Sequence, residues 1–398
     1  MTRSLLDLAQ AHLYGNYRPA PFVLSHGRGC ELFDTEGRRY LDMAAGVAVC
    51  ALGHGHPRYV AAISEQVARL GHVSNYFYNE PNIRLAVELC QRTGFARAFF
   101  CNSGAEANEA LLKMARRHFY AQGQTERFQI IAFDNSFHGR TMGALAMTGQ
   151  AKYQQGFAPG VGGVTHLPFG DLAAVEAAMG PAVAAVIVEP VQGEGGVIPA
   201  KPEFLQGLRR LCDQHGALLL VDEIQTGVGR TGTFLAHEQS AVQADAISLA
   251  KGLGGGFPIG AMLCGEHLAG ALPPGTHGST FGGNPLASAA ALAVLEVLDA
   301  EDLIAGARRK GAHLSARLLQ AAEQHPQLFE GERGMGLMRG LVLRPGADGR
   351  VALGLVRERG VLLTAAGDRT LRFTPPLTVS EAQLDEAVEG VVAALQKA

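Results

Sequence analysis

Two short runs of mostly apolar residues in this sequence each end on a side chain that can carry charge. Residues 246–250 lead directly to Lys251, which is followed by glycines, and residues 218–221 lead to Asp222. Such runs are typical of strands buried on both faces, and ligands bind at the carboxyl ends of these strands in open α/β sheets. An amine held half out of water has a lowered pKa and becomes nucleophilic, as a Schiff-base lysine must be.

Together, Lys251 and Asp222 are the pair that a pyridoxal-phosphate site needs: a lysine for the aldehyde and an aspartate for the ring nitrogen. A buried carboxylate without a partner would take up a proton, whereas an ionised Asp222 would keep the pyridine ring protonated. The alternative for Asp222 is a structural salt bridge. Gln225 lies one turn further on and could reach the phenolic oxygen of the same cofactor.

Residues 99–109 are typical of a strand, a tight turn and the start of a helix. Ser103 and Glu106 have the spacing of a capping box. The free amides of Gly104 and Ala105, together with the helix dipole, could bind a phosphate group. The motif by itself is more typical of an ordinary capped helix, and it indicates a phosphate site only beside a Schiff-base lysine.

The segment after the next apolar run contains Phe137, His138 and Arg140. Phe137 could lie flat against a pyridine ring, and Arg140 could hold a substrate carboxylate with two hydrogen bonds. Alternatively, Phe137 belongs to the core and Arg140 is a surface charge. His138 is interpreted as a structural hydrogen-bonding residue rather than a general base. Cys101 is interpreted as a small core residue.

Two further polar positions lie in glycine-rich surroundings. Glu194 lies in the loop 189–196, where backbone and ligand can come close, and Arg372 in the C-terminal part could face it. Either residue alone could be a solvated loop charge. Ser279 and Thr280 offer hydroxyls between glycines before an alanine-rich helix, without the spacing of a Walker loop.

The composition indicates a folded protein with two domains. The chain has 398 residues, of which 47% are hydrophobic and 18% charged, and its net charge is −3. This charge gives no basis for binding nucleic acid or a membrane, and no apolar run is long enough to span a bilayer. The first residues lack a secretory signal, and the six cysteines include no CxxC pair, so we expect reduced thiols and a cytoplasmic protein. No metal site is predicted.

The order of the predicted elements favours an α/β fold. Between residues 55 and 298, apolar runs alternate with helical patterns, which predicts a largely parallel sheet covered on both faces. Residues 299–398 form a C-terminal α+β domain that the N-terminal segment 1–54 completes. The strands expected in the large domain are 98–101, 129–133, 184–188, 217–221, 246–250 and 259–264. Later elements are a helix at 305–323, strands at 336–343, 361–363 and 370–373, and a helix at 380–395.

Taken together, these motifs resemble the class III, or ω-amino acid, aminotransferases of fold type I. The similarity covers nearly the whole chain and is most specific in residues 75–81, 103–109, 137–140 and 278–286, which are similar to class members that act on N2-acetylornithine. The resemblance implies a large domain with a mostly parallel seven-stranded sheet flanked by helices, a smaller α+β domain, and pyridoxal 5′-phosphate as cofactor.

The resemblance also implies a role in cofactor binding for each matching residue. Lys251 would bind the aldehyde covalently and then move the proton of the reaction, while Asp222 would pair with the ring nitrogen. Gln225 would contact the phenolic oxygen of the cofactor, and Phe137 would stack on the face of its ring. Gly104 and Ala105 would bind its phosphate. Thr280 would reach the phosphate in the neighbouring subunit, which implies a homodimer.

For the substrates, the resemblance implies transfer of the δ-amino group of N2-acetylornithine to 2-oxoglutarate, a step of arginine biosynthesis. Arg140 would hold the α-carboxylate of acetylornithine, and Ser279 would lie near the substrate. Arg372 would hold the α-carboxylate of 2-oxoglutarate or glutamate, and Glu194 would cover Arg372 while the ω-amine is bound. An arginine neutralised by a movable glutamate suits both substrates.

Other functions use some of the same residues. Ornithine, succinylornithine, 4-aminobutyrate or a lysine-pathway amine could replace acetylornithine, and an aminomutase or racemase would keep Lys251 and Asp222 without releasing an oxo acid. A dinucleotide-binding dehydrogenase would need a GxGxxG motif directly after the first strand and an acidic residue about 20 positions further on, and the sequence does not offer this context. A non-catalytic binding protein would have no use for a costly strand-end lysine.

Overall fold

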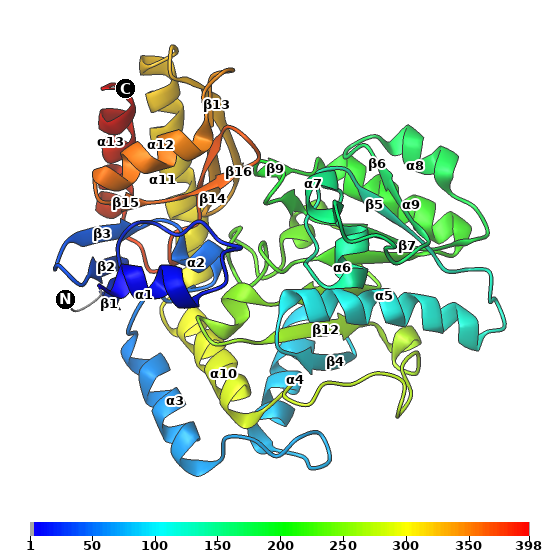
Figure 1. The fold of residues 1–398 in the computed structure, drawn as a ribbon. Helices are drawn as coiled ribbons and strands as arrows, with labels where there is room; N and C mark the ends of the chain where they lie inside the picture. The colour runs from blue at the N-terminus through cyan, green and yellow to red at the C-terminus, as the bar shows by residue number, and fades with distance from the viewer. Residues whose placement is uncertain (1–3, 398) are drawn as a thin grey trace.

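A seven-stranded sheet lies at the centre of the computed structural model, which describes residues 4–397 (Figure 1). Its strands are β4 (Arg97–Cys101), β5 (Gln129–Phe133), β6 (Val164–Leu167), β7 (Val183–Val188), β10 (Leu218–Asp222), β11 (Ala246–Leu249) and β12 (Gly260–Cys264). They lie in the order β4-β12-β11-β10-β7-β5-β6, and within the described chain β12 alone runs in the direction opposite to the other six strands. The predicted α/β fold with a mostly parallel seven-stranded sheet is confirmed.

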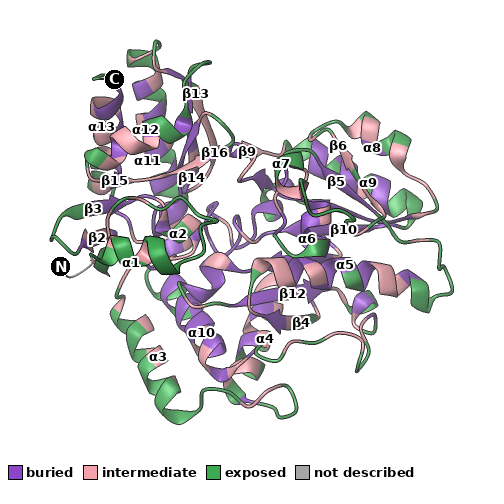
Figure 2. Ribbon diagram, viewed as in Figure 1, coloured by how far each residue is buried: buried purple, intermediate pink, exposed green. Residues whose placement is uncertain are grey.

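Helices cover both faces of this sheet, which explains why its strands are apolar throughout. Leu218 and Leu220 of β10 pack in the same cluster as α5 (Gly104–Ala121), whereas Leu219 and Val221 pack with α9 (Pro202–His215). Successive side chains of a strand point to opposite faces, so both faces of β10 are buried. Figure 2 shows the buried strands between helices whose outer faces are exposed.

The C-terminal third and the N-terminal segment form a second group of elements beside the large sheet (Figure 1). One antiparallel sheet has the order β13-β14-β17-β16, and another joins three N-terminal strands to β15. β15 runs parallel to β3, with Val361 opposite Leu41. The strands are β1 (Leu24–Arg28), β2 (Glu31–Asp34), β3 (Arg39–Asp42), β13 (Phe329–Met335), β14 (Met338–Leu343), β15 (Val361–Leu362), β16 (Thr364–Ala366) and β17 (Thr370–Phe373).

The remaining elements connect and cover these sheets. The helices are α1 (Leu5–His12), α2 (Ala45–Ala48), α3 (Pro57–Arg69), α4 (Glu80–Thr93), α6 (Met142–Met147), α7 (Ala151–Gln154), α8 (Leu172–Ala178), α10 (Pro285–Ala300), α11 (Leu303–Gln324), α12 (Gly349–Glu358) and α13 (Glu381–Leu395). Short elements are β8 (Val191–Gln192), β9 (Ile198–Pro199) and the 3₁₀ turns η1 (Ala236–Ser240), η2 (Lys251–Gly254) and η3 (Glu266–Leu268). No helix within residues 4–397 is long and apolar enough to cross a membrane.

Several strands were not expected from the sequence, among them the short β8, β9 and β16 and the two edge strands β6 and β13. β6 was not predicted; it is the edge strand of the large sheet and contains only two apolar residues, Val164 and Leu167, so it gives no continuous apolar run. β13 was not predicted either, because it is an edge strand rich in charge and glycine, and the expected strand at 336–343 begins two residues later, as β14. In both cases pairing with a neighbouring strand, not local composition, decides the structure.

Candidate active site

The carboxyl ends of the parallel strands open into a cavity of about 400 Å³. β10 and β11 are neighbours in register, with Asp222 opposite Ser248, so the residues after both strands lie at the same edge of the sheet. Eight of the eleven predicted site residues line this cavity: Gly104, Ala105, Phe137, Arg140, Glu194, Asp222, Gln225 and Lys251. Segments far apart in the sequence therefore meet at the place expected for a ligand in an open α/β sheet.

Lys251 begins the turn η2 directly after β11. Its φ of 40° lies in the left-handed region that residues with a side chain rarely adopt, so the neighbouring structure must hold it there. Burial lowers the pKa of the Lys251 amine to about 8, although the carboxylates of Glu194 and Asp222 act in the opposite direction. The amine is therefore neutral in about a tenth of molecules at pH 7, far more than an ordinary lysine, and the neutral amine is the nucleophile.

Asp222 is the last residue of β10 and is 4% exposed. Its Oδ2 accepts hydrogen bonds from Asn108 Nδ2 and His138 Nδ1, each at 2.7 Å, while Oδ1 accepts the N–H of Ile224 at 3.0 Å. These donors replace the hydrogen bonds to water that the carboxylate loses on burial. The alternative of a structural salt bridge is partly realised, because His138 is an ion-pair partner when protonated.

The turn before α5 has the form of an anion site. Ser103 Oγ accepts the N–H of Glu106 at 3.2 Å, which caps the helix, and the Glu106 carboxylate accepts the N–H of Asn102 at 2.7 Å. The predicted capping box is therefore incomplete, because the Glu106 carboxylate accepts the backbone N–H of Asn102 and the hydroxyl of Ser103, but not the backbone N–H of Ser103. The first-turn amides of Gly104 and Ala105 have no acceptor within the helix and border the cavity.

Phe137 and Arg140 also line the cavity, and both contact Tyr153. The Arg140 guanidinium lies 4.0 Å from the centroid of the Tyr153 ring and 5.6 Å from that of Phe137. The rings of Phe137 and Tyr153 meet edge to face at 5.8 Å. Arg140 is exposed in the single chain. Stacking on aromatic faces fixes the guanidinium plane and leaves its N–H groups available to a carboxylate.

Glu194 and Arg372 come into direct contact at the end of the cavity. Arg372 Nη1 donates to Glu194 Oε1 at 2.5 Å and to Gln225 Oε1 at 3.1 Å, while its Nε donates to Thr364 Oγ1 at 3.0 Å. Burial would raise the pKa of Glu194, but the charges of Arg372 and Lys251, together with the hydrogen bonds from Arg372 and Gln225, outweigh it and lower the pKa. Arg372 is 1% exposed, so its charge depends on Glu194 for compensation.

Ser279 and Thr280 do not line this cavity in the single chain. Arg372 does not line it either, but it contacts Glu194, which does. Ser279 Oγ accepts hydrogen bonds from Asn102 Nδ2 at 3.1 Å and from the N–H of Gly282 at 3.0 Å. Thr280 is exposed. Both residues lie in a segment whose outer face is open to solvent.

Several polar residues at the site received no catalytic or binding role in the sequence-based predictions, among them Asn108, His138 and Glu189. Asn108 is fully buried and interrupts the apolar face of α5. A polar residue within the apolar face of a predicted helix is the pattern that could have indicated Asn108 from the sequence. Glu189 accepts the N–H of Phe137 at 3.1 Å and that of Gly193 at 3.4 Å. Burial raises the pKa of Glu189 to about 7. His138 is the structural hydrogen-bonding residue that was expected.

Comparison with known proteins gives a consistent result. A model of the class-III aminotransferases matches residues 14–395. An acetylornithine aminotransferase from Myxococcus xanthus is 52% identical over 387 residues, 96% of each chain. The structure of N-acetylornithine aminotransferase from Stenotrophomonas maltophilia is 41% identical, with a TM-score of 0.86 over 99% of each chain. That of ornithine aminotransferase from Toxoplasma gondii is 34% identical, with a TM-score of 0.94 over 98% of this chain and 94% of that chain.

Proposed function

The chain belongs to the class-III aminotransferase family, and on this premise we propose that it moves the δ-amino group of N2-acetylornithine to 2-oxoglutarate. The products are N-acetylglutamate 5-semialdehyde and glutamate, and the reaction is a step of arginine biosynthesis. One observation carries the proposal: the strand-end residues Lys251 and Asp222 share a cavity with the paired Glu194 and Arg372. The name of the 52% identical relative supports the choice of substrate.

The residues of the cavity fit pyridoxal 5′-phosphate. Gly104 lets the turn before α5 pass close to Ile224 at the edge of the cavity, because a Cβ there would lie only 2.7 Å from Ile224 Cδ1. The first-turn amides of Gly104 and Ala105 would hold the phosphate, Phe137 would cover one ring face, and Asp222 would hold the ring nitrogen. When bound, this cofactor supplies a carbonyl for the amino group and a ring that accepts electrons from the substrate carbon.

Gln225 and Lys251 complete the cofactor contacts in this proposal. The Gln225 side chain lies in the cavity with its Oε1 bonded to Arg372, and its amide would face the phenolic oxygen. Lys251 holds an amine whose pKa of about 8 permits both protonation states near neutral pH. Its Nζ would therefore take the proton from the substrate carbon and return it, because proton transfer is most efficient when the pKa lies near the working pH.

Glu194 and Arg372 account for the use of two unlike substrates. With Glu194 on Arg372, the end of the cavity is nearly neutral and suits an ω-amine whose reacting carbon bears no carboxylate. When Glu194 moves away, Arg372 offers a planar guanidinium to the α-carboxylate of 2-oxoglutarate or glutamate. Arg140, already oriented by Tyr153, would hold the α-carboxylate of acetylornithine.

We also propose that the working form is a homodimer in which Thr280 reaches the phosphate of the partner's cofactor and Ser279 lies near the partner's substrate. Asn75 Nδ2 donates to the carbonyls of Ser279 and Gly282, which joins two neighbouring loops. These loops also present Tyr76, Phe77, Tyr78 and Phe281, which are 59–95% exposed. An exposed patch of aromatic side chains is typical of a protein interface.

The division into domains remains a proposal as well. We propose that residues 55–298 form the cofactor domain and that 299–398 form the small domain, completed by 1–54; residues 1–3 and 398 lie outside the described part. The parallel pairing of β3 with β15 supports this assignment, as does the bond from the N–H of Thr374 to the carbonyl of Met43 at 2.8 Å.

A series of half-reactions tests the function. The enzyme loaded with pyridoxal phosphate is mixed with acetylornithine, ornithine, 4-aminobutyrate or succinylornithine without any oxo acid, and the decay of the cofactor's visible absorbance is followed. We expect fast decay with acetylornithine and slow decay with ornithine, the substrate named for the Toxoplasma gondii structure. Faster decay with another amine would reassign the substrate, and release of no oxo product would favour an aminomutase.

A further inference from the structure

The geometry points to His138 as a positioning residue for Asp222, an inference that rests on the proposed function. We propose that its imidazole fixes the Asp222 carboxylate in the orientation that the ring nitrogen of the cofactor requires. His138 is 1% exposed, and its Nδ1 lies 2.7 Å from Asp222 Oδ2. His138 acts through Asp222, so its effect should appear first in cofactor binding.

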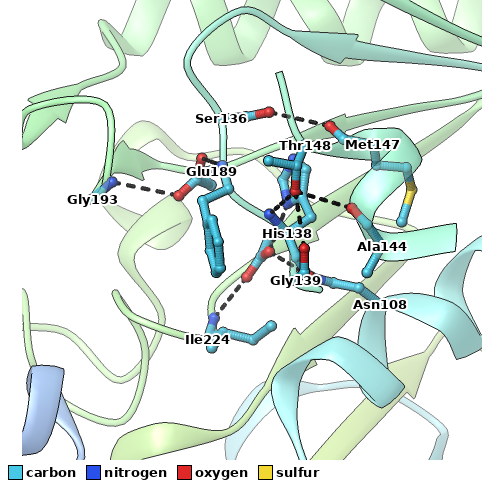
Figure 3. Close-up of polar contacts among 12 residues, drawn as sticks. Asn108, Ser136, His138, Gly139, Ala144, Met147, Thr148, Glu189, Gly193 and Ile224 are labelled. Atoms are coloured by element: carbon cyan, nitrogen blue, oxygen red, sulfur yellow. Dashed lines mark hydrogen bonds and ion pairs between the residues drawn. The ribbon is translucent and has the colours of Figure 1, made fainter. Parts of the chain in front are cut away.

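The imidazole can serve this purpose because hydrogen bonds hold both the backbone N–H and the backbone carbonyl of His138. The N–H of His138 donates to Thr148 Oγ1 at 2.9 Å, and the carbonyl of His138 accepts from Asn108 Nδ2 at 2.7 Å (Figure 3). Thr148 Oγ1 in turn donates to the carbonyl of Ala144 at 3.0 Å. Asn108 Nδ2 also donates to Asp222 Oδ2, so one amide joins the histidine backbone to the carboxylate.

The donors are distributed unequally over the two Asp222 oxygens. Oδ2 accepts from both Asn108 and His138, whereas Oδ1 accepts only the N–H of Ile224 at 3.0 Å within the described chain. A carboxylate oxygen can accept more than one hydrogen bond. The pair of donors on Oδ2 therefore fixes the rotation of the carboxylate, and Oδ1 keeps further acceptor capacity on a residue that lines the cavity.

The other imidazole nitrogen, Nε2, makes no hydrogen bond within the described chain that would compete with the contact to Asp222. His138 Nε2 has no hydrogen-bond partner among residues 4–397, so the ring's directional contact is the one to Asp222. Burial lowers the pKa of His138, but the hydrogen bond and charge of Asp222 outweigh it and raise the pKa overall. The structure thus keeps an N–H on Nδ1 directed at the carboxylate.

A neighbouring pair provides a matched control. His237 Nδ1 lies 2.8 Å from Glu223 Oε1; both residues are buried, and Glu223 directly follows the same strand β10. Neither residue lines the cavity. A general loss of stability from breaking a buried histidine–carboxylate bond should be similar at both places, whereas an effect on the cofactor should arise only at His138.

The experiment compares His138→Asn with His138→Gln, and His237→Asn with His237→Gln. An asparagine amide can take the place of Nδ1, whereas a glutamine amide reaches the place of Nε2 and leaves the carboxylate without its donor. Each holoenzyme is dialysed against cofactor-free buffer, the Kd for pyridoxal phosphate is measured by titration, and the thermal midpoint is measured without cofactor. We expect His138→Gln to weaken binding about tenfold or more and His138→Asn to restore most of it.

The outcomes separate this inference from the proposed function. Equal affinity of His138→Gln and the unaltered enzyme would overturn it, and so would an equal loss in His237→Gln. If His138→Gln fails to fold, His138→Asn still tests the inference. A Kd for pyridoxal phosphate within about twofold of that of the unaltered enzyme supports a hydrogen bond at the position of Nδ1. A loss of affinity like that of an Asp222→Asn variant refutes the inference. Turnover of acetylornithine by the unaltered enzyme tests the function alone.

Discussion

Arg372 Nη1 lies 2.5 Å from Glu194 Oε1, although one residue lies in a strand and the other in a distant loop, and they are separated by much of the chain. Arg372 lies on β17, and Glu194 lies in the glycine-rich loop between β8 and β9. The contact closes one end of the cavity that contains Lys251. It makes the charge at that end depend on the position of a single side chain.

Replacing Glu194 with glutamine should shift the preference of the site toward dicarboxylates. The buried Arg372 would lose its counter-ion, so a substrate carboxylate would gain that interaction without first displacing Glu194. We expect the KM for glutamate to fall about tenfold and the half-reaction with acetylornithine to slow by a similar factor. Rapid-mixing measurement of the two half-reactions checks this.

Glu332→Gln provides the control for that variant. Glu332 pairs with Arg339 at 3.4 Å and is also poorly exposed, but it lies on β13 and does not line the cavity. Its loss should leave the ratio of the two half-reactions unchanged. An unaltered ratio in Glu194→Gln would show that the contact with Arg372 does not govern substrate choice.

The second prediction concerns the pH at which Lys251 binds the cofactor aldehyde. Burial lowers the pKa of the amine to about 8, so the nucleophilic neutral form dominates above that pH and declines below it. The rate of cofactor attachment to the apoenzyme should fall about tenfold for each pH unit below 8 and level off above about 9. Stopped-flow absorbance measures this rate, and a flat profile from about pH 6 to 9 would contradict the assignment of Lys251.

A companion variant removes the amine itself. Lys251→Ala should show no turnover and no visible absorbance from covalently attached cofactor, because no other lysine lines the cavity within the described chain. Retention of both properties would overturn the central assignment. Circular dichroism of the variant separates loss of chemistry from loss of folding.

The third prediction tests the shared active site. Thr280→Ala should retain cofactor poorly, with a Kd raised about tenfold, because one charge-assisted hydrogen bond to the phosphate is lost. Thr280 is exposed and lies outside the cavity of its own chain, so the defect should arise in the partner's site. Titration of each apoenzyme with pyridoxal phosphate measures the change, and an unaltered Kd would contradict the phosphate contact.

Hybrid dimers decide whether Thr280 serves its own site or the partner's. They form when Thr280→Ala and Lys251→Ala chains are mixed after reversible dissociation. If Thr280 serves the partner, each hybrid contains one complete site, so roughly a quarter of all sites regain tight binding and full activity. If Thr280 serves its own chain, every site lacks either Lys251 or Thr280, and no site recovers. Mixing Lys251→Ala with unaltered chains provides the control for subunit exchange.

The fourth prediction uses a glycine whose replacement should displace Gln225. A Cβ at Gly193 would overlap the Gln225 amide oxygen, which accepts a hydrogen bond from Arg372. Gly193→Ala should therefore reduce kcat/KM about tenfold or more while the fold persists. Gly270→Ala is the control, because its Cβ would meet no atom within 4 Å. Equal activity of both variants would contradict the role of Gln225.

Much of this site could be inferred from the residue types and their spacing. The apolar runs that end at Asp222 and Lys251 identified two strands of the large sheet, because a strand buried on both faces leaves a continuous apolar pattern. The turn at Ser103 and Gly104 indicated an anion site, because its residue types suit a capped helix that follows a strand. Local chemistry and spacing are enough for such features, since each depends on neighbours in the sequence.

The tertiary structure alone decided which distant residues meet. Nothing in the segment around Arg372 determines that it contacts Glu194, and nothing around His138 and Asn108 determines that both donate to one oxygen of Asp222. Likewise β6 and β13 form because a neighbouring strand pairs with them, not because their residues favour a strand. The sequence by itself thus determined the types of chemical group and the strand ends that carry them. Their partners were decided by packing, because contacts between distant segments depend on the whole fold.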